Sequence, residues 1–173
     1  MLKRYEDKFP ILGTGVFIAE NAFVIGDVEL GDHANVWYNC VIRGDEHEIR
    51  IGPRTNIQDG TIIHATEGLY RTLIGADVTI GHNVVIHGCT LEDSCLIGIS
   101  ATVLDEAIVE SGAVVAAGAV VTPGKRVTSG QVWAGCPARP MRDVTDAERQ
   151  MIEEIPEEYC AQAARYLKAA GDD

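Results

Sequence analysis

Aliphatic residues recur at every sixth position over most of the chain. The series holds eighteen positions between Ile18 and Val127, and it changes register in three places only. A spacing of six fits neither the 3.6-residue repeat of an α-helix nor the two-residue alternation of a simple strand. It fits a prism in which each short strand forms one side, each bend forms a corner, and the aliphatic residue points inward. The series is Ile18, Val24, Leu30, Val36, Ile42, Ile51, Ile57, Ile63, Ile74, Ile80, Ile86, Leu91, Ile97, Val103, Val109, Val115, Val121 and Val127.

Small or β-branched residues follow most of these aliphatic positions by four, where the corner of the prism tightens. They include Ala22, Val28, Ala34, Cys40, Thr55, Thr61, Val78, Val84, Cys95, Ala101, Ala107, Ala113 and Ala119. Repeats of this kind are similar to those of the hexapeptide-repeat superfamily, over about residues 11–135. The resemblance implies a mainly β fold, a left-handed parallel β-helix of about six coils.

All three breaks in the repeat belong to one side of the predicted prism. Three hexads make a coil of about 18 residues, so every third aliphatic residue lies on the same side. The breaks are an insertion of three residues between Ile42 and Ile51, an insertion of five between Ile63 and Ile74, and a deletion of one between Ile86 and Leu91. Irregular loops that gather on one side of a regular scaffold indicate a functional site there.

Helices are expected after the repeats end. Residues 145–148 (TDAE) form a capping box that predicts a helix start. Pro156 is predicted to interrupt this helix, and a second helical stretch is predicted from Glu157 to about Ala170. The prediction is therefore a repeat domain over residues 1–140 and a helical appendage over residues 141–173, packed on the outside of the prism.

Two of the five histidines are predicted to stack. His64 and His87 each directly follow an aliphatic position of the series, and their separation of 23 residues equals one coil of 18 plus the insertion of five. Neighbouring strands lie about 4.8 Å apart, so two such imidazoles can converge on one metal ion at roughly 2.0–2.1 Å from each nitrogen. Arg43 occupies the same column one coil earlier.

A third histidine, His82, is predicted on the preceding side of the prism. It follows Ile80 by two residues, and Asp59 holds the equivalent place one coil earlier. The path to His87, five residues of about 3.3 Å each, is too long for one subunit to share a metal comfortably. A second subunit that presents its His82 to the stacked pair removes this difficulty, and three such interfaces close a cyclic trimer. Stacking alone does not prove a metal site, and solvated histidines remain the alternative.

The composition limits the classes of function. A formal net charge of −12 argues against nucleic acid or an anionic membrane as a partner, because both need a basic face. No apolar run approaches the roughly 18 residues of a spanning helix, and the first ten residues do not resemble a secretory signal. Five cysteines without CxxC spacing are typical of reduced thiols in the cytoplasm, with positions 40 and 95 in the core and 89 in a packing role.

The chemistry-bearing residues resemble those of the gamma-class carbonic anhydrases and their bacterial homologues. The resemblance spans about residues 11–143. It implies a homotrimeric enzyme with zinc or iron at its subunit interfaces (Co²⁺ is a further candidate), which hydrates CO₂ reversibly to bicarbonate by metal-bound hydroxide. It implies that His64 and His87 are same-chain ligands and that His82 is given across the interface. The matching stretches are Arg43–Glu46, Ile51–Gly52, Thr55–Asp59, His64, Ile80–His82 and His87–Cys89.

The same resemblance implies roles for further side chains around the metal. The founding enzyme's long acidic loop is reduced here to about Glu67–Arg71, which argues against rapid proton export and high turnover. The implied roles are a hydrogen bond to the metal-bound water for Gln58, a charged interface network for Arg43, Asp45 and Asp59, proton transfer for Glu46 and Glu67, and a place near the site for Tyr159.

Two other functions stay open on the sequence. The same repeat carries CoA-dependent acyltransferases, in which one histidine deprotonates the acceptor; three spaced histidines favour the metal site instead. The other alternative is a non-catalytic metal-binding trimer, and the shortened loop is its best support. Fold alone does not choose among these functions.

Overall fold

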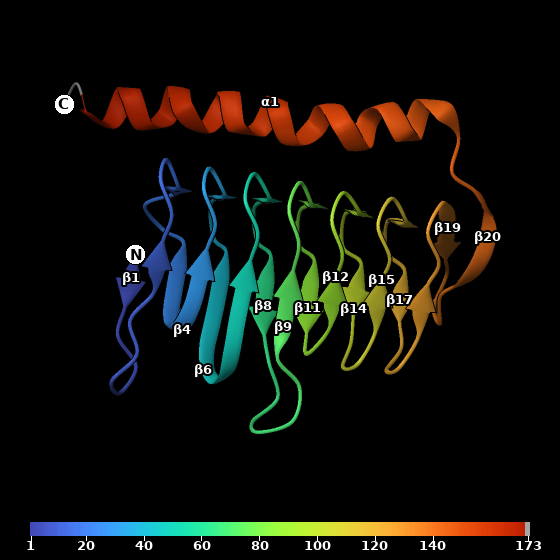
Figure 1. Cartoon of the computed structure of the whole chain (residues 1–173), viewed down its shortest axis with the longest axis horizontal. Helices are drawn as coiled ribbons and strands as arrows, with labels where there is room; N and C mark the ends of the chain where they lie inside the picture. Colours follow the sequence, from blue (N-terminus) through green and yellow to red (C-terminus); the bar gives the residue numbers. More distant parts are fainter. Residues whose placement is uncertain (172–173) are drawn as a thin grey trace.

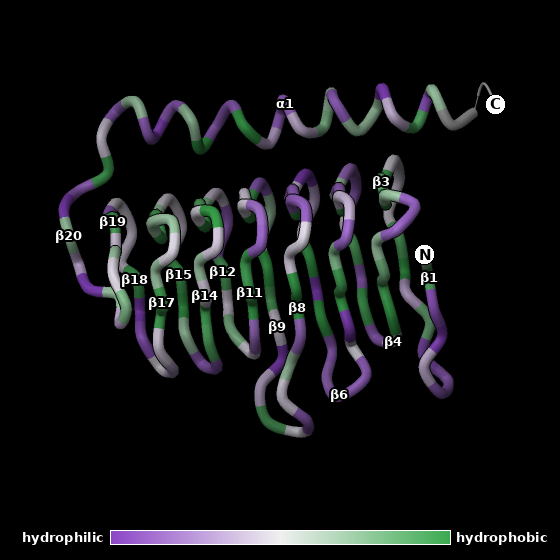
Figure 2. The backbone as a smooth tube through the Cα atoms, turned by 180° about the vertical axis from the view of Figure 1, so that it is seen from behind, coloured by the Kyte–Doolittle hydropathy of each residue, from purple (hydrophilic) through white to green (hydrophobic). Residues whose placement is uncertain are grey.

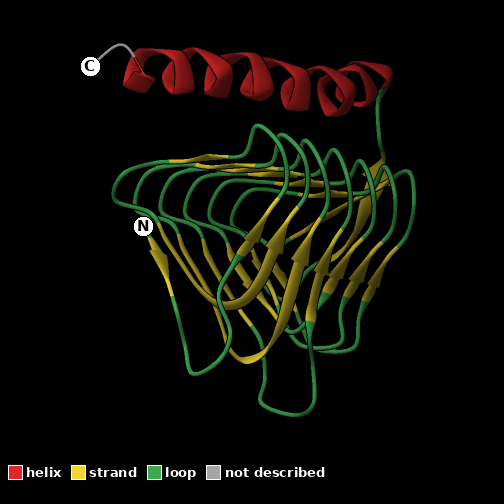
Figure 3. Cartoon of the chain, turned by 60° about the vertical axis from the view of Figure 1, so that its left-hand side comes forward, coloured by secondary structure: helices red, strands yellow, loops and turns green. Residues whose placement is uncertain are grey.

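The computed structural model describes residues 1–171 as a parallel β-solenoid with one long helix alongside it (Figure 1). Each coil is built from three short strands, so the sequence prediction of a parallel β-helix is confirmed. The strands of two sides form one continuous sheet, because β4 (Phe23–Leu30) and β6 (Val41–Ile51) each bend around the corner between them. Viewed more nearly along the axis, the coils stack as rounded triangles with the helix outside (Figure 3).

Each side of the solenoid carries seven strand levels within the described residues, one more than the six coils predicted. The side that bears the histidine pair holds β1 (Leu2–Lys3), part of β4 and of β6, β8 (Ile62–His64), β11 (Val85–His87), β14 (Thr102–Val103) and β17 (Val120–Val121). The next side holds β2 (Ile11–Leu12), the rest of β4 and β6, β9 (Thr72–Ile74), β12 (Thr90–Leu91), β15 (Ile108–Val109) and β18 (Arg126–Val127). The third side holds β3 (Phe17–Ile18), β5 (Asn35–Val36), β7 (Asn56–Ile57), β10 (Thr79–Ile80), β13 (Leu96–Ile97), β16 (Val114–Val115) and β19 (Gln131–Ala134). The aliphatic series runs only from Ile18 to Val127, so it leaves out Leu12 and Trp133, which continue the spacing of six at its two ends, and Leu2 in β1, which pairs with β4 outside that spacing.

The core follows the repeat closely. Of the eighteen aliphatic positions, all but Ile18 are buried, and the small residues at the corners are buried with them. Figure 2 shows hydrophobic residues concentrated along the strands and hydrophilic residues at many of the bends. The inward series of single aliphatic side chains therefore fills most of the prism, and the aromatic Trp133 takes the inward place at the last level of its side.

The two insertions enlarge one corner of the solenoid. The first is absorbed as a bulge in β6, since Gly26 pairs with Gly44 but Val28 already pairs with Ile49. The second forms the loop of residues 65–71 between β8 and β9, which projects beyond the other bends (Figure 1). The first insertion is thus part of a bent strand and not a separate loop, because its flanks keep pairing with β4 and with β9.

A single helix, α1 (Asp146–Gly171), runs along the outside of the solenoid and back toward its N-terminal end (Figure 1). The predicted interruption at Pro156 is therefore wrong. A proline removes one backbone hydrogen bond inside a helix, but Pro156 is buried together with Ile152 and Ala163 on the face toward the strands. This packing keeps the helix continuous. Within residues 1–171, no helix combines the length and apolar character that crossing a membrane requires.

The predicted capping box at the start of α1 is confirmed. The Thr145 backbone N–H and hydroxyl donate to the Glu148 carboxylate at 2.9 and 2.8 Å, and the Glu148 N–H donates to the Thr145 hydroxyl at 3.3 Å. Thr145→Ala removes the two bonds made by the hydroxyl and keeps only the one from the backbone N–H, so we expect the free energy of unfolding in urea to fall by about 1 kcal/mol. Thr145→Ser keeps the hydroxyl and serves as the control. An unchanged midpoint for the alanine variant would contradict the assigned cap.

Candidate metal centre

His64 and His87 stack on adjacent strands as the coil arithmetic predicts. His64 ends β8 and His87 ends β11, and the two residues are register partners in the parallel sheet. His64 Nδ1 lies 3.2 Å from His87 Nε2, with the ring planes tilted by 58°. Two imidazole nitrogens from one chain thus point at one another on the outer surface of the solenoid.

Each imidazole of this pair contacts a carboxylate through its other nitrogen. His64 Nε2 lies 3.1 Å from Asp45 Oδ1, and His87 Nδ1 lies 2.7 Å from Asp105 Oδ1. An ionised carboxylate accepts only, so in neutral imidazoles these outer nitrogens carry the hydrogens. The facing nitrogens then both present lone pairs, and no hydrogen remains to join them.

The facing lone pairs fit a divalent metal. Two nitrogen ligands at roughly 2.0–2.1 Å from a tetrahedral zinc lie about 3.3–3.4 Å apart, close to the 3.2 Å separation of His64 Nδ1 and His87 Nε2. Metal-binding histidines ordinarily donate their second N–H to a carboxylate or carbonyl. Within residues 1–171, however, no single-chain group of three or more potential ligands is arranged to hold a metal. The geometry of the pair thus suits two ligands of a metal, and within the described residues no third side chain joins them.

His82 lies apart from the pair, as predicted. It follows β10 in the chain, and its Nδ1 lies 3.0 Å from an Asp59 carboxylate oxygen. Its side chain is 40% exposed. Ile99, which occupies the same column one coil later, is 52% exposed. An accessible imidazole beside an exposed aliphatic side chain suits a surface that meets another protein chain.

Gln58 and Tyr159 belong to the neighbourhood of His82. Gln58 precedes Asp59, is buried, and donates through its side-chain amide to Asn56 Oδ1 at 3.1 Å. Tyr159 projects from α1 and packs edge-on against Trp37, with ring centroids 5.4 Å apart. Burial foremost, and then the charge of Asp59, raises the pKa of the Tyr159 hydroxyl.

Arg43 and Asp45 belong to the neighbourhood of the stacked pair. The Arg43 guanidinium donates to Asp45 Oδ2, while Asp45 Oδ1 contacts His64. Partial burial of the Asp45 carboxyl acts to raise its pKa, but the hydrogen bonds from Arg43 and His64, a backbone hydrogen bond and the charge of Arg43 lower it overall. Asp45 is therefore held as an anion against the His64 ring.

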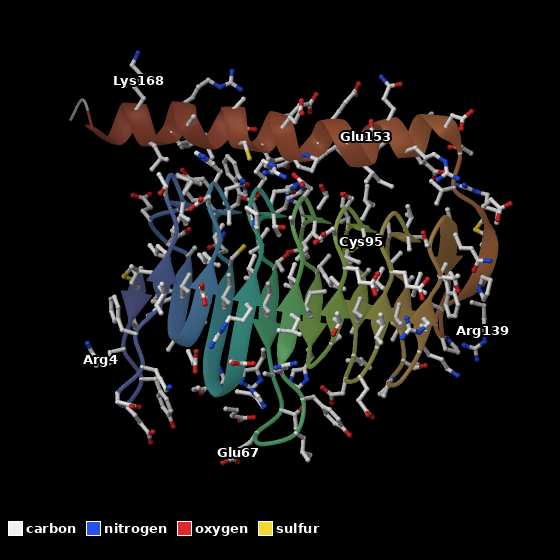
Figure 4. All side chains as sticks on the ribbon, viewed as in Figure 1. Arg4, Glu67, Cys95, Arg139, Glu153 and Lys168 are labelled. Atoms are coloured by element: carbon white, nitrogen blue, oxygen red, sulfur yellow. The ribbon has the colours of Figure 1, made fainter. Side chains whose placement is uncertain are left out.

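Glu46 and Glu67 meet at the enlarged corner beside the pair. The Glu67 backbone N–H donates to the Glu46 carboxylate at 3.2 Å. Figure 4 shows Glu67 on the projecting loop. A hollow of about 360 Å³ opens next to them and is lined in part by Asp45, Glu46 and His47. Glu46 thus links the projecting loop to β6, the strand that carries Asp45. His47 is partly exposed, and its Nδ1 accepts the Glu48 N–H at 2.8 Å.

The predicted site residues therefore fall into two groups at opposite ends of the side formed by β8 and β11. One group surrounds the stacked pair at the end of these strands, and the other surrounds His82 in the turns that precede them. The first contains Arg43, Asp45, Glu46, His64, Glu67 and His87; the second contains Gln58, Asp59, His82 and Tyr159.

Sequence reasoning missed Asp105 and Thr72, which contact the ends of the two histidine strands, and Thr66, which contacts Asp105. The Asp105 carboxylate contacts His87 and also accepts the Thr66 hydroxyl at 3.2 Å. The Thr72 hydroxyl donates to the His64 carbonyl at 2.6 Å and accepts the Gly88 N–H at 3.0 Å, so it joins the ends of β8 and β11. One signal for Asp105 was available, since it follows His87 by 18 residues, one coil. The deletion between Ile86 and Leu91 moves it one position past the histidine column, which hid it.

Three cysteines are core residues and carry no site chemistry. Cys40, Cys89 and Cys95 are at most 1% exposed, which confirms the packing roles predicted for them. Burial raises the pKa of the Cys40 thiol to about 11 and that of the Cys89 thiol to about 12. Cys89, although two residues beyond His87, is therefore held as a neutral thiol.

Comparison with known proteins places this geometry in a family. The chain is 49% identical over 158 residues to "Probable carbonic anhydrase" of Methanocaldococcus jannaschii, covering 91% of this chain and 94% of that protein. The chain belongs to the gamma carbonic anhydrase family. Within that family it is also 46% identical to "Gamma carbonic anhydrase 2, mitochondrial" of Arabidopsis thaliana, over 88% of this chain. It spans only 57% to 61% of the length of the three Arabidopsis relatives that it matches.

A similar solved structure is described as a transferase family protein instead. A protein from Anaplasma phagocytophilum described as "hexapeptide transferase family protein" superposes with a TM-score of 0.91 at 42% identity, over 95% of this chain and 97% of that one. The Anaplasma protein and this member of the gamma carbonic anhydrase family therefore have the same hexapeptide-repeat fold. No protein-family model matches the chain.

Proposed function

We propose that this protein is a metal-dependent carbonic anhydrase that interconverts CO₂ and bicarbonate. The observation that carries the proposal is the pair of facing imidazole nitrogens, 3.2 Å apart, each oriented by a carboxylate behind it. The family relationship supports the same chemistry, since two relatives with substantial coverage are named for that activity. An arrangement with three neutral imidazoles leaves a divalent metal its full charge and a free position for water.

The third ligand is proposed to be His82 of a neighbouring copy in a homotrimer. In one chain, His82 lies at the opposite end of the β8–β11 side from the pair, and its ring contacts Asp59 instead. A closed ring of three copies would bring the His82 group of each chain to the histidine pair of the next. Exposed aliphatic side chains next to both groups, Ile62 (46%) and Ile99 (52%), support an interface there.

Zinc is the proposed metal, with Fe²⁺ and Co²⁺ as alternatives. Imidazole suits all three ions, and availability and geometry decide among them. His64, His87 and the neighbouring copy's His82 would hold the metal, which would supply an acidic water for attack on CO₂. The overall change is CO₂ plus H₂O to HCO₃⁻ plus H⁺, so the protein must also release one proton per turnover.

The chain's own residues would orient the reacting water, hold the histidine rings in place and export the proton. Gln58, buried and fixed through Asn56, presents its remaining amide groups to the reacting water. Asp45 holds the His64 ring, and Arg43 in turn holds Asp45. Glu46 and Glu67 are proposed to pass the proton to buffer along the open corner. Tyr159, which lies in the neighbourhood of His82, is proposed to border the site when that histidine meets the pair of the next copy.

Metal content and CO₂ hydration of the purified wild-type protein test the proposal directly. We expect about one metal ion per chain after anaerobic purification, and hydration that a chelator abolishes and metal restores. A metal-loaded trimer without hydration would indicate a structural metal site. Absence of metal together with acetyl-CoA binding would favour the CoA-dependent acyltransferase alternative; the Anaplasma structure is itself described as a transferase family protein.

A further inference from the structure

The Asp105 carboxylate contacts Nδ1 of His87, the ring nitrogen that does not face His64. It lies in the turn after β14, and its Oδ1 is 2.7 Å from His87 Nδ1. Among the described residues, no Lys or Arg lies within 4.0 Å of this carboxylate. By contrast, Asp45, behind the other ligand, divides its charge between His64 and Arg43. The negative charge of Asp105 is therefore directed at one ring.

A glycine makes this contact possible. Gly88, directly after His87, has a φ of 53°, and a Cβ at this position would lie 2.1 Å from Asp105 Oδ1 and 2.9 Å from the Tyr70 Cβ. Any side chain there would push the carboxylate away from the ring. The local backbone is thus shaped to bring a carboxylate from the next coil onto His87.

The same oxygen also fastens the projecting loop. The Thr66 hydroxyl donates to Asp105 Oδ1 at 3.2 Å, so one carboxylate connects the loop of residues 65–71 to the ligand ring. This second contact suggests a rival explanation, in which Asp105 serves only to anchor the loop. The two explanations differ in what happens to the His87 ring when the loop contact alone is removed.

We propose that Asp105 is the positioning residue of His87. It fixes the tautomer with hydrogen on Nδ1, so that the Nε2 lone pair faces His64 Nδ1, and it makes the ring a stronger electron donor. Its consequence for metal binding rests on the proposed function, whereas its effect on the ring does not. A carboxylate behind a ligating histidine ordinarily governs ring orientation and ligand strength.

Asp105→Asn in the full-length protein tests the consequence for the metal. The amide keeps the shape but not the charge, and its NH₂ can turn toward Nδ1 and impose the opposite tautomer. We expect zinc affinity, measured by competition with a chromogenic chelator, to fall about 10–100-fold. Asp93→Asn is the matched control, because Asp93 also follows an inward aliphatic residue by two positions but accepts the Ala76 backbone N–H at 2.7 Å. The control should bind zinc like the wild type.

Nitrogen NMR of ¹⁵N-histidine-labelled, metal-free protein tests the ring itself. At about pH 8, where ordinary histidines are neutral, His87 of the wild type should show the Nδ1–H tautomer, and Asp105→Asn should lose it. Thr66→Val removes only the loop contact and should keep both the tautomer and the zinc affinity.

The outcomes separate the two proposals. An unchanged tautomer and affinity in Asp105→Asn would overturn the positioning role, and so would a loss of both in Thr66→Val. If Asp105→Asn fails to fold, Thr66→Val and the wild-type tautomer still decide, because a wild-type His87 protonated on Nε2 refutes the role. If the wild type shows the Nδ1–H tautomer but binds no metal, the positioning role survives and the proposed carbonic anhydrase function falls.

Discussion

His82→Ala is expected to empty the metal site as completely as His64→Ala, although the two side chains lie at opposite ends of one side of the solenoid. Each variant removes one of three proposed ligands, so zinc affinity should fall by more than the roughly 10–100-fold typical of residues behind the ligands. Metal content after dialysis against a weak chelator measures the loss. His33→Asn is the control, since His33 is exposed and Asn tolerates its φ of 60°.

Mixing the two defective subunits gives a sharper result. In a ring of three, each site needs an intact pair from one chain and an intact His82 from the next. Every trimer that contains both variants then regains one of its three sites, so random exchange of equal amounts should restore about a quarter of the wild-type metal. Neither variant alone should regain any. A mixture that stays empty after verified exchange would refute the shared site, as would a monomer with full metal content.

The fold was largely predictable because the spacing of the repeat determines the geometry of each coil. A spacing of six with small residues at the corners admits few arrangements, and each inward position is recognisable from one residue. The stacking of His64 and His87 followed from the same count, since an insertion of five and a coil of 18 add to 23. Regular arithmetic therefore predicted both the scaffold and the part of the site built on its columns.

The errors lie where tertiary packing overrides local preference. Pro156 predicts a break in the helix, but its burial against the strands keeps α1 continuous. The three extra residues before Ile51 read as a loop, but their flanks continue the pairing of β4 with β6. Such outcomes depend on neighbours that are distant in the chain, so local sequence patterns do not reveal them.

Part of the site escaped prediction for a different reason. Asp105 reaches His87 from the next coil only because Gly88 has no side chain and a positive φ. The hydroxyl of Thr72 is fully buried between two ligand strands, at a position where a threonine is unremarkable in sequence. Contacts that orient a ligand depend on angles and on single atoms. The column count does not contain that information.

Arg43→Ala should weaken the trimer more than it alters the single chain. The Arg43 guanidinium donates to Asp45, whose other oxygen holds His64, and its side chain is 42% exposed in the isolated chain. In the proposed trimer this pair becomes covered, and removing one partner then leaves the Asp45 charge uncompensated. Truncation of such a covered pair costs about 2–5 kcal/mol, so the concentration at which the trimer dissociates should rise by about 30-fold or more.

Sedimentation across a range of protein concentrations measures this shift, and circular dichroism checks that the solenoid is intact. Arg126→Ala is the matched control, because Arg126 makes an ion pair with Glu110 at 2.7 Å but lies on β18, distant along the solenoid from the histidine pair. Exposed pairs of that kind contribute at most about 1 kcal/mol. Equal effects of the two substitutions would mean that Arg43 does not lie in a subunit interface. Because the proposed third ligand, His82, comes from a neighbouring copy, the dissociated Arg43→Ala chain should also lose its metal.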